Sequence, residues 1–210
     1  MSSSRDRALA IIELLVRNVR GLPMSEIGDT LGVPRSAAHR LLADLKATGY
    51  VKQDPVTSHY LLTVRLAALG LAFLAGKGIT DLAQPVLDEL AEATGELARL
   101  AVAEEDQLVW VAKAQGTRTG LRYDPDSGAD VYLPASANGL AFLAAVSEET
   151  GLRLLAEQGM ERAVSMGPGA PKTLREVMDR VQETRDRGYA VVFDSYEAGT
   201  SAVAAVIRRD

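Results

Sequence analysis

The chain has 210 residues, of which 47% are hydrophobic, and a formal net charge of −5. This length and composition allow a sizeable core and favour two modest domains over one. Because the sequence contains no cysteine, disulfides and thiolate metal sites are excluded. The first residues lack the apolar stretch of a signal peptide, and no stretch reaches the roughly 18 apolar residues of a membrane span. We therefore expect a cytoplasmic protein without a membrane partner.

The charge is unevenly divided along the chain. Residues 1–63 carry 8 Lys and Arg against 6 Asp and Glu, a balance of +2, and the remainder carries 15 against 22, a balance of −7. Both histidines, His39 and His59, also lie in the first part. A basic segment within an acidic chain indicates a polyanionic partner.

Three helices are predicted in the first fifty residues. The first covers residues 5–19, where apolar residues recur at spacings of three and four: Ala8, Ile11, Ile12, Leu15 and Val19. A short second helix is predicted with Ser25 as its N-cap and Gly32 just beyond its end. Pro34 suits the first turn of a third helix, which is expected to stop at Gly49.

The third helix has two different faces. A buried stripe is predicted at spacings i, i+3, i+4 and i+7: Ala38, Leu41, Leu42 and Leu45. Polar side chains that are displaced from this stripe crowd its first two turns: Arg35, Ser36, His39 and Arg40. They are either an ordinary solvated face or a surface that reads DNA.

The residues that follow favour the DNA interpretation. Residues 49–54 and 60–63 are predicted strands joined by residues 55–59, a β-hairpin that completes the order of a winged helix-turn-helix domain. We expect four residues to face the major groove: Arg35, Ser36, Ala37 and His39. We expect three more to hold phosphates: Arg40, Lys52 and His59. Lys52 and His59 also fit a role as plain solvated residues.

Residues 64–76 are apolar nearly all round, and such a helix must be covered on several sides. Either it is central in a core or it packs against the same helix of another chain. Its place between two small domains favours the second interpretation. The predicted organisation is therefore a DNA-binding domain over 1–63, a linker helix over 64–78 and a further domain over 79–210.

The further domain alternates between helical and strand patterns. An amphipathic helix over 81–95 tolerates Pro85 only near its start, and residues 97–115 predict a hairpin with an acidic turn. Another strand is expected near 120–123. Helices are predicted over 136–146, 148–158 and 173–188, and strands over 189–193 and 201–207. This order predicts the α+β class, an antiparallel sheet with helices packed on it.

Three segments of the sequence resemble those of the IclR-type bacterial transcriptional regulators. The segment "PRSAAHRLL", which begins at Pro34, is similar to the usual recognition helix Pro-Lys-Ser-Thr-Ala-x-Arg-Leu-Leu of that family, with Arg for Lys and Ala for Thr. Residues 133–149 and 187–207 are similar to two further family segments. The resemblance implies a GAF-like C-terminal domain that binds a small effector. It also implies a homodimer or a dimer of dimers on a double-stranded DNA operator.

The same resemblance suggests where an effector binds, at six positions: Ala137, Asn138, Gly139, Val192, Phe193 and Ala202. Small residues at a helix start let a ligand approach, and outward N–H groups there can bind a carboxylate. Arg99 is a further carboxylate partner. Tight packing for the small residues and a solvated role for Arg99 are the competing interpretations, and Trp110 is predicted to be core.

Two departures from the family pattern shape the expectation. Val192 and Phe193 stand where the family often has acidic residues, so we expect an aromatic or longer-chain acid as effector. The family usually continues for a turn and a strand or two past the position of Asp210, so its last strands are expected to be missing.

An enzyme is the main rival class. No His or Cys follows residue 63, which removes the usual acid–base, thiol and zinc chemistry from the larger domain. The segment "GPGAPKT" at residues 167–173 is no phosphate-binding loop, because Pro171 replaces the glycine before Lys172. We expect no enzyme, cofactor or metal. A DNA-binding dimer whose C-terminal domain only oligomerises stays open as the alternative.

Overall fold

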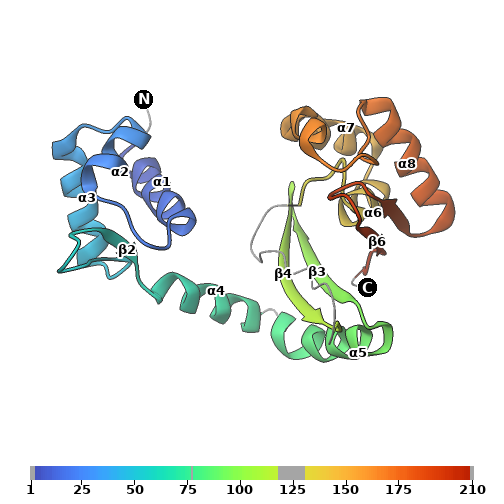
Figure 1. Ribbon diagram of the computed structural model, residues 1–210, viewed down its shortest axis with the longest axis horizontal. Coiled ribbons are helices and arrows are strands. Elements are labelled where there is room, and N and C mark those ends of the chain that lie inside the picture. Colours follow the sequence, from blue (N-terminus) through green and yellow to red (C-terminus); the bar gives the residue numbers. More distant parts are fainter. Residues whose placement is uncertain (1–2, 77, 118–130, 209–210) are drawn as a thin grey trace. The chain divides into compact units, whose positions relative to one another are not determined.

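Three helices around a small hairpin open the chain, and a longer α+β part follows. The computed structural model describes residues 3–76, 78–117 and 131–208, in two compact units, Met1–Lys77 and Gly78–Asp210 (Figure 1). The elements of the first unit are, in order, α1 (Ser4–Arg17), α2 (Met24–Leu31), α3 (Arg35–Ala47), β1 (Val51–Gln53), β2 (Tyr60–Leu62) and α4 (Arg65–Gly76).

The ends of α1 and α2 differ from the prediction. Helix α1 stops at Arg17, and Val19 is 82% exposed instead of buried. Helix α2 begins at Met24, so Ser25 lies inside it and caps nothing. A contact with a residue far along the chain explains both differences. Leu22 pairs with Tyr60 through two backbone hydrogen bonds of 3.1 and 2.8 Å. This pairing keeps the chain extended just before α2.

Helix α3 has the predicted buried stripe, since Ala38, Leu41, Leu42 and Leu45 are all buried. They pack with Ile11, Leu15 and other apolar side chains into the core of the first unit. The helix ends at Ala47, two residues before Gly49, which takes the left-handed conformation at φ +79°. The buried stripe thus packs one side of α3 against the core of the first unit, and the opposite side of the helix does not contact that core.

No residue of α4 is buried. Leu69, Leu71 and Phe73 are at least half exposed along it. Within the described residues, no single helix is long and apolar enough to cross a membrane. Among these residues, α4 and the segment 81–94 meet that length and composition only when taken together, and they are two helices separated by a break and a bend.

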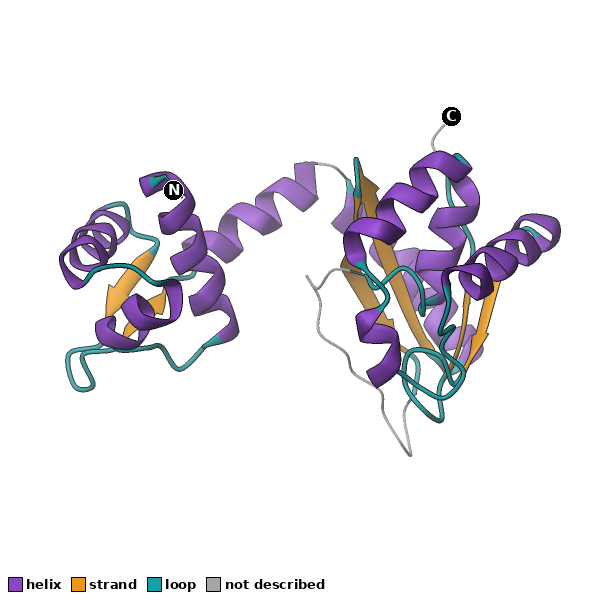
Figure 2. Ribbon diagram, turned by 90° about the horizontal axis from the view of Figure 1, so that it is seen from above, coloured by secondary structure: helices purple, strands orange, loops and turns teal. Residues whose placement is uncertain are grey.

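The second unit consists of helices packed on strand pairs. Its elements are α5 (Gln84–Thr94) after a π-helical turn (Ile79–Ala83), β3 (Leu97–Glu104), β4 (Gln107–Gln115), α6 (Ala137–Ala145), α7 (Glu148–Gln158), a 3-10 helical turn (Glu161–Ser165), α8 (Leu174–Arg187), β5 (Ala190–Phe193) and β6 (Ser201–Ala204). The pairs β3–β4 and β5–β6 are antiparallel (Figure 2). The α+β prediction is confirmed, and Pro85 lies in the first turn of α5 as expected. The strand predicted near 120–123 lies outside the described residues.

The β3–β4 hairpin contributes to two separate clusters. Near its base, Ala98 and Ala114 pack on α5. A register shift between Leu100 and Ala101 follows, and beyond it Leu108 and Trp110 join the main core around α6 and α8. The bulge therefore lets one hairpin serve two packing surfaces.

Candidate DNA interface and effector site

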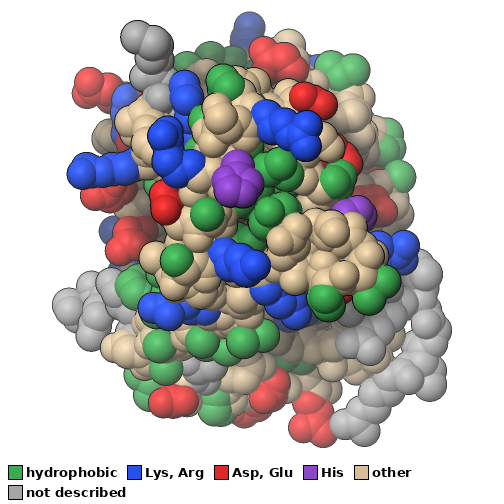
Figure 3. All heavy atoms as spheres, turned by 90° about the vertical axis from the view of Figure 1, so that its left-hand side faces the viewer, with side chains coloured by type: hydrophobic (Ala, Val, Ile, Leu, Met, Phe, Trp, Pro, Cys, Tyr) green, Lys and Arg blue, Asp and Glu red, His purple; other side chains and the backbone are tan. Residues whose placement is uncertain are grey.

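The first two turns of α3 present polar side chains to solvent. Arg35, Ser36, His39 and Arg40 are exposed, and Ala37 is half-buried. The buried stripe on the opposite side of the helix fixes this orientation. On the face of the molecule shown in Figure 3, Lys and Arg side chains lie around a histidine. The arrangement has the chemistry needed to contact base edges and phosphates.

The hairpin beside α3 is organised by Asp54, which sequence reasoning missed. Its Oδ1 accepts hydrogen bonds of 2.8 Å from the N–H groups of Val56 and Thr57. These two bonds hold the pKa of the Asp54 carboxyl below its ordinary value. Aspartate at the start of a turn commonly makes such bonds, so the signal was present in the sequence. The turn connects β1, which carries the exposed Lys52, to the half-buried His59.

The start of α6 is built around Ser136, another residue that the sequence did not single out. Its hydroxyl accepts a hydrogen bond from the N–H of Gly139 at 3.0 Å and donates one to the carbonyl of Tyr132 at 2.8 Å. The expectation that the Gly139 N–H points outward is therefore wrong, because the helix cap uses it. Ala137 is buried and Asn138 is half-buried.

The small size of Gly139 is explained by packing. A Cβ atom at this position would lie 2.4 Å from both the Cα and the carbonyl oxygen of Leu133. The backbone of residue 133 thus occupies the space that we had expected a ligand to use at this residue.

Residues 192 and 193 point in opposite directions. Val192 is buried in the main core together with Ala137, whereas Phe193 is 67% exposed. Ala202, the register partner of Val192 on β6, is also exposed. Side chains alternate along a strand, so Val192 and Phe193 cannot both line an interior site. The sequence contained this signal, because both residues fall within one predicted strand.

Arg99 lies against the main core. The guanidinium carbon of Arg99 is 3.5 Å from the centre of the Trp110 ring, and Trp110 is buried in the same cluster as Ala137 and Val192. Arg99 itself is half-buried. Its register partner across the hairpin is Lys113. Arg99 and an aromatic ring thus lie at the edge of this core, with Lys113 opposite Arg99 in the hairpin, a set that suits a flat carboxylate.

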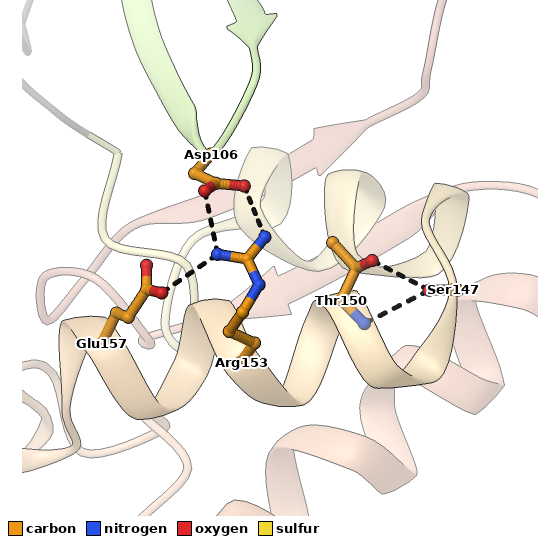
Figure 4. A network of polar contacts seen from close by, with 5 residues as sticks. All are labelled: Asp106, Ser147, Thr150, Arg153 and Glu157. Carbon is orange, nitrogen blue, oxygen red and sulfur yellow. Dashed lines mark hydrogen bonds and ion pairs between the residues drawn. The ribbon is translucent and has the colours of Figure 1, made fainter.

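The turn between β3 and β4 is fastened to α7 by an ion-pair network (Figure 4). Arg153 on α7 donates to both carboxylate oxygens of Asp106 in the turn and to Glu157 one helical turn further on. These bonds lower the pKa of Asp106 and raise that of Arg153. The network is about half exposed, so it orients the hairpin more than it stabilises the fold.

Two hollows lie in the described part of the second unit. One, of about 250 Å³, is lined by residues of α6 and α8 together with Gly188, Val206 and Arg208. The other, of about 180 Å³, lies among the β3–β4 turn, Leu133 and α7. The predicted effector residues line neither of them. Among the residues the structure describes, no group of three or more His, Asp or Glu could hold a metal ion.

Polar groups of the "GPGAPKT" segment form hydrogen bonds with backbone carbonyls elsewhere in the second unit. Gly167 and Gly169 donate their N–H groups to the carbonyls of Ser195 and Asp194, and the Lys172 ammonium donates to the Ala163 carbonyl at 2.7 Å. These bonds use the groups that a phosphate-binding loop would offer to its ligand.

Comparisons with known proteins cover both units. Residues 71–210 match the family model described as the bacterial transcriptional regulator IclR C-terminal domain, and residues 4–55 match the IclR helix-turn-helix domain. The chain is 27% identical to the transcriptional repressor IclR of Escherichia coli over 206 residues, 97% of this chain and 74% of that protein. It is 33% identical to the HTH-type transcriptional regulator BhcR of Paracoccus denitrificans over 202 residues, 96% of this chain and 71% of the relative.

A solved structure shares the same fold. An IclR homolog from Microbacterium hydrocarbonoxydans, complexed with 4-hydroxybenzoate, superposes with a TM-score of 0.84 at 21% identity, covering 99% of this chain and 84% of that one. The relatives above are transcriptional regulators and repressors, not enzymes. The chain therefore belongs to the IclR family of bacterial DNA-binding transcriptional regulators.

Proposed function

We propose that this protein is a transcriptional regulator whose affinity for a DNA operator is controlled by a small organic acid. The observation that carries the DNA part is the exposed polar N-terminal face of α3 opposite its fully buried stripe. Arg35, Ser36, Ala37 and His39 enter the major groove, where arginine pairs with guanine and serine with either kind of base edge. Arg40, Lys52 and His59 hold phosphates and set the register of the domain on the duplex.

The DNA proposal is tested by titrating the full chain with mixed-sequence duplex DNA over a series of salt concentrations. Binding should weaken linearly on a double-logarithmic plot, because phosphate contacts release counterions. Operators are then selected from random duplexes, and these should bind more tightly than the mixed sequence at the same salt. A chain that binds no DNA even at low salt would refute the proposed function.

We assign the effector to the edge of the main core in the second unit, where Arg99 stacks on Trp110. The carboxylate faces Arg99 and Lys113, and the apolar part of the ligand lies beside the Trp110 ring at the edge of the core that contains Ala137 and Val192. The exposure of Phe193 and Ala202 and the capped N–H of Gly139 give these three residues a lesser part. An aromatic or longer-chain acid suits this lining, and the Microbacterium homolog complexed with 4-hydroxybenzoate lends support.

The effector proposal is tested by calorimetry with 4-hydroxybenzoate, octanoate, acetate and oxalate. We expect binding of the first two, and its loss in Arg99→Leu. The matched control is Arg175→Leu, since Arg175 is an exposed arginine on α8 of the same unit. Binding of only the small polar acids contradicts the assigned class. If none of the acids changes the operator affinity, the alternative function, an effector-independent DNA-binding dimer, is favoured.

We further propose a homodimer or a dimer of dimers in which α4 is one contact surface. Its apolar residues, such as Leu69 and Leu71, are at least half exposed. An exposed apolar stretch of this kind is typical of an interaction surface. Sedimentation should show an oligomer for the wild type and a smaller species for Leu69→Glu, and an unchanged size for this variant would exclude α4 from the contact.

A further inference from the structure

The beginning of α4 is connected to the end of the recognition helix by a short series of hydrogen bonds. The N–H of Tyr50 donates to the carbonyl of Leu45 in α3 at 2.9 Å, and the N–H of Thr63 donates to the carbonyl of Tyr50 at 2.9 Å. The Thr63 hydroxyl donates to the carbonyl of Gly49 at 2.6 Å and accepts from the N–H of Arg65 at 3.2 Å. One hydroxyl thus connects the turn after α3 to the first residue of α4.

A stacked pair supports the same connection. The guanidinium of Arg65 lies 5.2 Å from the centre of the Tyr50 ring, and Tyr50 packs against the core of the first unit. The Arg65 side chain also lies beside the Gly49 backbone, since a Cβ atom at Gly49 would be in ordinary van der Waals contact with Nη1 of Arg65, at 3.6 Å. A flat guanidinium over an aromatic ring is a directional contact that lysine reproduces poorly.

None of the residues of α4 is buried, so the contacts of Tyr50, Thr63 and Arg65 at its start contribute strongly to its direction relative to α3. With 12 residues, α4 is about 18 Å long, and a rotation of about 15° at its start moves its far end by about 5 Å. A small change in angle at Thr63 or Arg65 therefore produces a large displacement of the C-terminal end of α4.

We propose that Thr63, Arg65 and Tyr50 form a joint that sets the angle between α3 and α4. In an oligomer held together through α4 or the second unit, this angle fixes the separation of the recognition helices and hence the half-site spacing that the protein accepts. The inference rests on the proposed function, because it requires a DNA-binding oligomer. Thr63 and Arg65 are positioning residues, and the readout is spacing preference instead of affinity alone.

The test uses the full chain and operators selected from random duplex DNA. Affinity is measured for a duplex with one half-site and for duplexes whose half-sites are moved apart by about a fifth and about half of a helical turn. The wild type should lose about ten-fold or more in affinity at the altered spacings. Thr63→Val and Arg65→Lys should lose less than about three-fold there, while binding the single half-site within about two-fold of the wild type.

Two conservative variants and three outcomes decide the question. Thr63→Ser keeps the hydroxyl and Tyr50→Phe keeps the ring, so both should show the wild-type spacing preference. The joint is refuted if Thr63→Val and Arg65→Lys also keep that preference, or if their single-site binding falls in parallel with it. A wild type that binds DNA without any spacing preference refutes it too, whereas a wild type that binds no DNA refutes the proposed function instead.

Discussion

Replacing Ser136 by alanine should destabilise the second unit far more than the same change at a matched helix cap. Ser136 is 5% exposed, and its hydroxyl bonds the Gly139 N–H and the Tyr132 carbonyl, both in buried residues. Loss of an N-cap costs about 1 kcal/mol. That loss already includes the Gly139 N–H, and the Tyr132 carbonyl left without its partner adds about 1 to 3 kcal/mol. We expect a total loss of about 2 to 4 kcal/mol in the free energy of unfolding.

Ser147 provides the control. It caps α7 in the same way, by accepting from the N–H of Thr150 at 3.2 Å, and its hydroxyl also contacts the Thr150 hydroxyl (Figure 4). Because Ser147 is exposed, water replaces the lost bonds, and Ser147→Ala should cost about 0.5 to 1 kcal/mol.

Urea denaturation followed by tryptophan fluorescence measures both variants. The sequence has a single tryptophan, Trp110, which is buried in the main core of the second unit, so the signal reports the unit that contains both caps. An equal or smaller loss for Ser136→Ala than for Ser147→Ala would refute the reasoning that burial makes the cap of α6 costly.

The remaining predictions concern the DNA interface, the packing of α6 and the hairpin turn. Arg35→Ala should cost about 1 to 3 kcal/mol of operator binding and relax base preference, whereas Arg40→Ala should weaken binding to all sequences and flatten the salt slope by about 1; equal effects in fluorescence anisotropy would mean that the helix is misplaced in the groove. Gly139→Ala forces a Cβ atom to 2.4 Å from the Leu133 backbone and should lower the free energy of unfolding by about 3 kcal/mol, which the same urea titration measures; a loss under about 1 kcal/mol would contradict the packing explanation. The Asp54 carboxyl has a pKa lowered from 3.8 by its bonds to the turn, so its stabilisation is complete above that pH and is lost as the pH falls below it. Amide protection at residues 56 and 57, measured relative to intrinsic exchange rates, should fall in that acidic range, and Asp54→Asn should remove this pH dependence; a wild-type turn that stays equally protected throughout would argue against the assignment.

The buried and exposed sides of α3 could be predicted almost completely from the sequence, and the helix ends could not. The stripe of α3 depends on spacing within one helix, so local periodicity was sufficient to predict Ala38, Leu41 and Leu42 as buried. The end of α1 and the start of α2 depend on the pairing of Leu22 with Tyr60. That contact joins residues far apart in the chain, and no local sequence pattern predicts it.

The two candidate sites also differ in how their residues are distributed along the chain. The recognition surface comes from two successive turns of one helix, so a correct helix places all of its side chains at once. The effector site draws Arg99 from β3, Trp110 from β4 and Val192 from β5. Their direction depends on a bulge in the hairpin and on strand alternation, and both of these follow from the assembled fold.

The same contrast explains why the joint between α3 and α4 is the more informative target for mutation. In the proposed scheme, a change at Arg35 alters which bases a single domain contacts, and a change at Arg99 alters which ligand the second unit binds. Thr63 contacts neither DNA nor ligand in this scheme, yet its hydroxyl is shared by the turn after α3 and the first residue of α4. An effector can change operator affinity only through a geometry that differs between two states. If the Thr63 hydroxyl can be removed while binding to a single half-site persists, then the geometry that transmits the effector signal can be changed separately from base recognition.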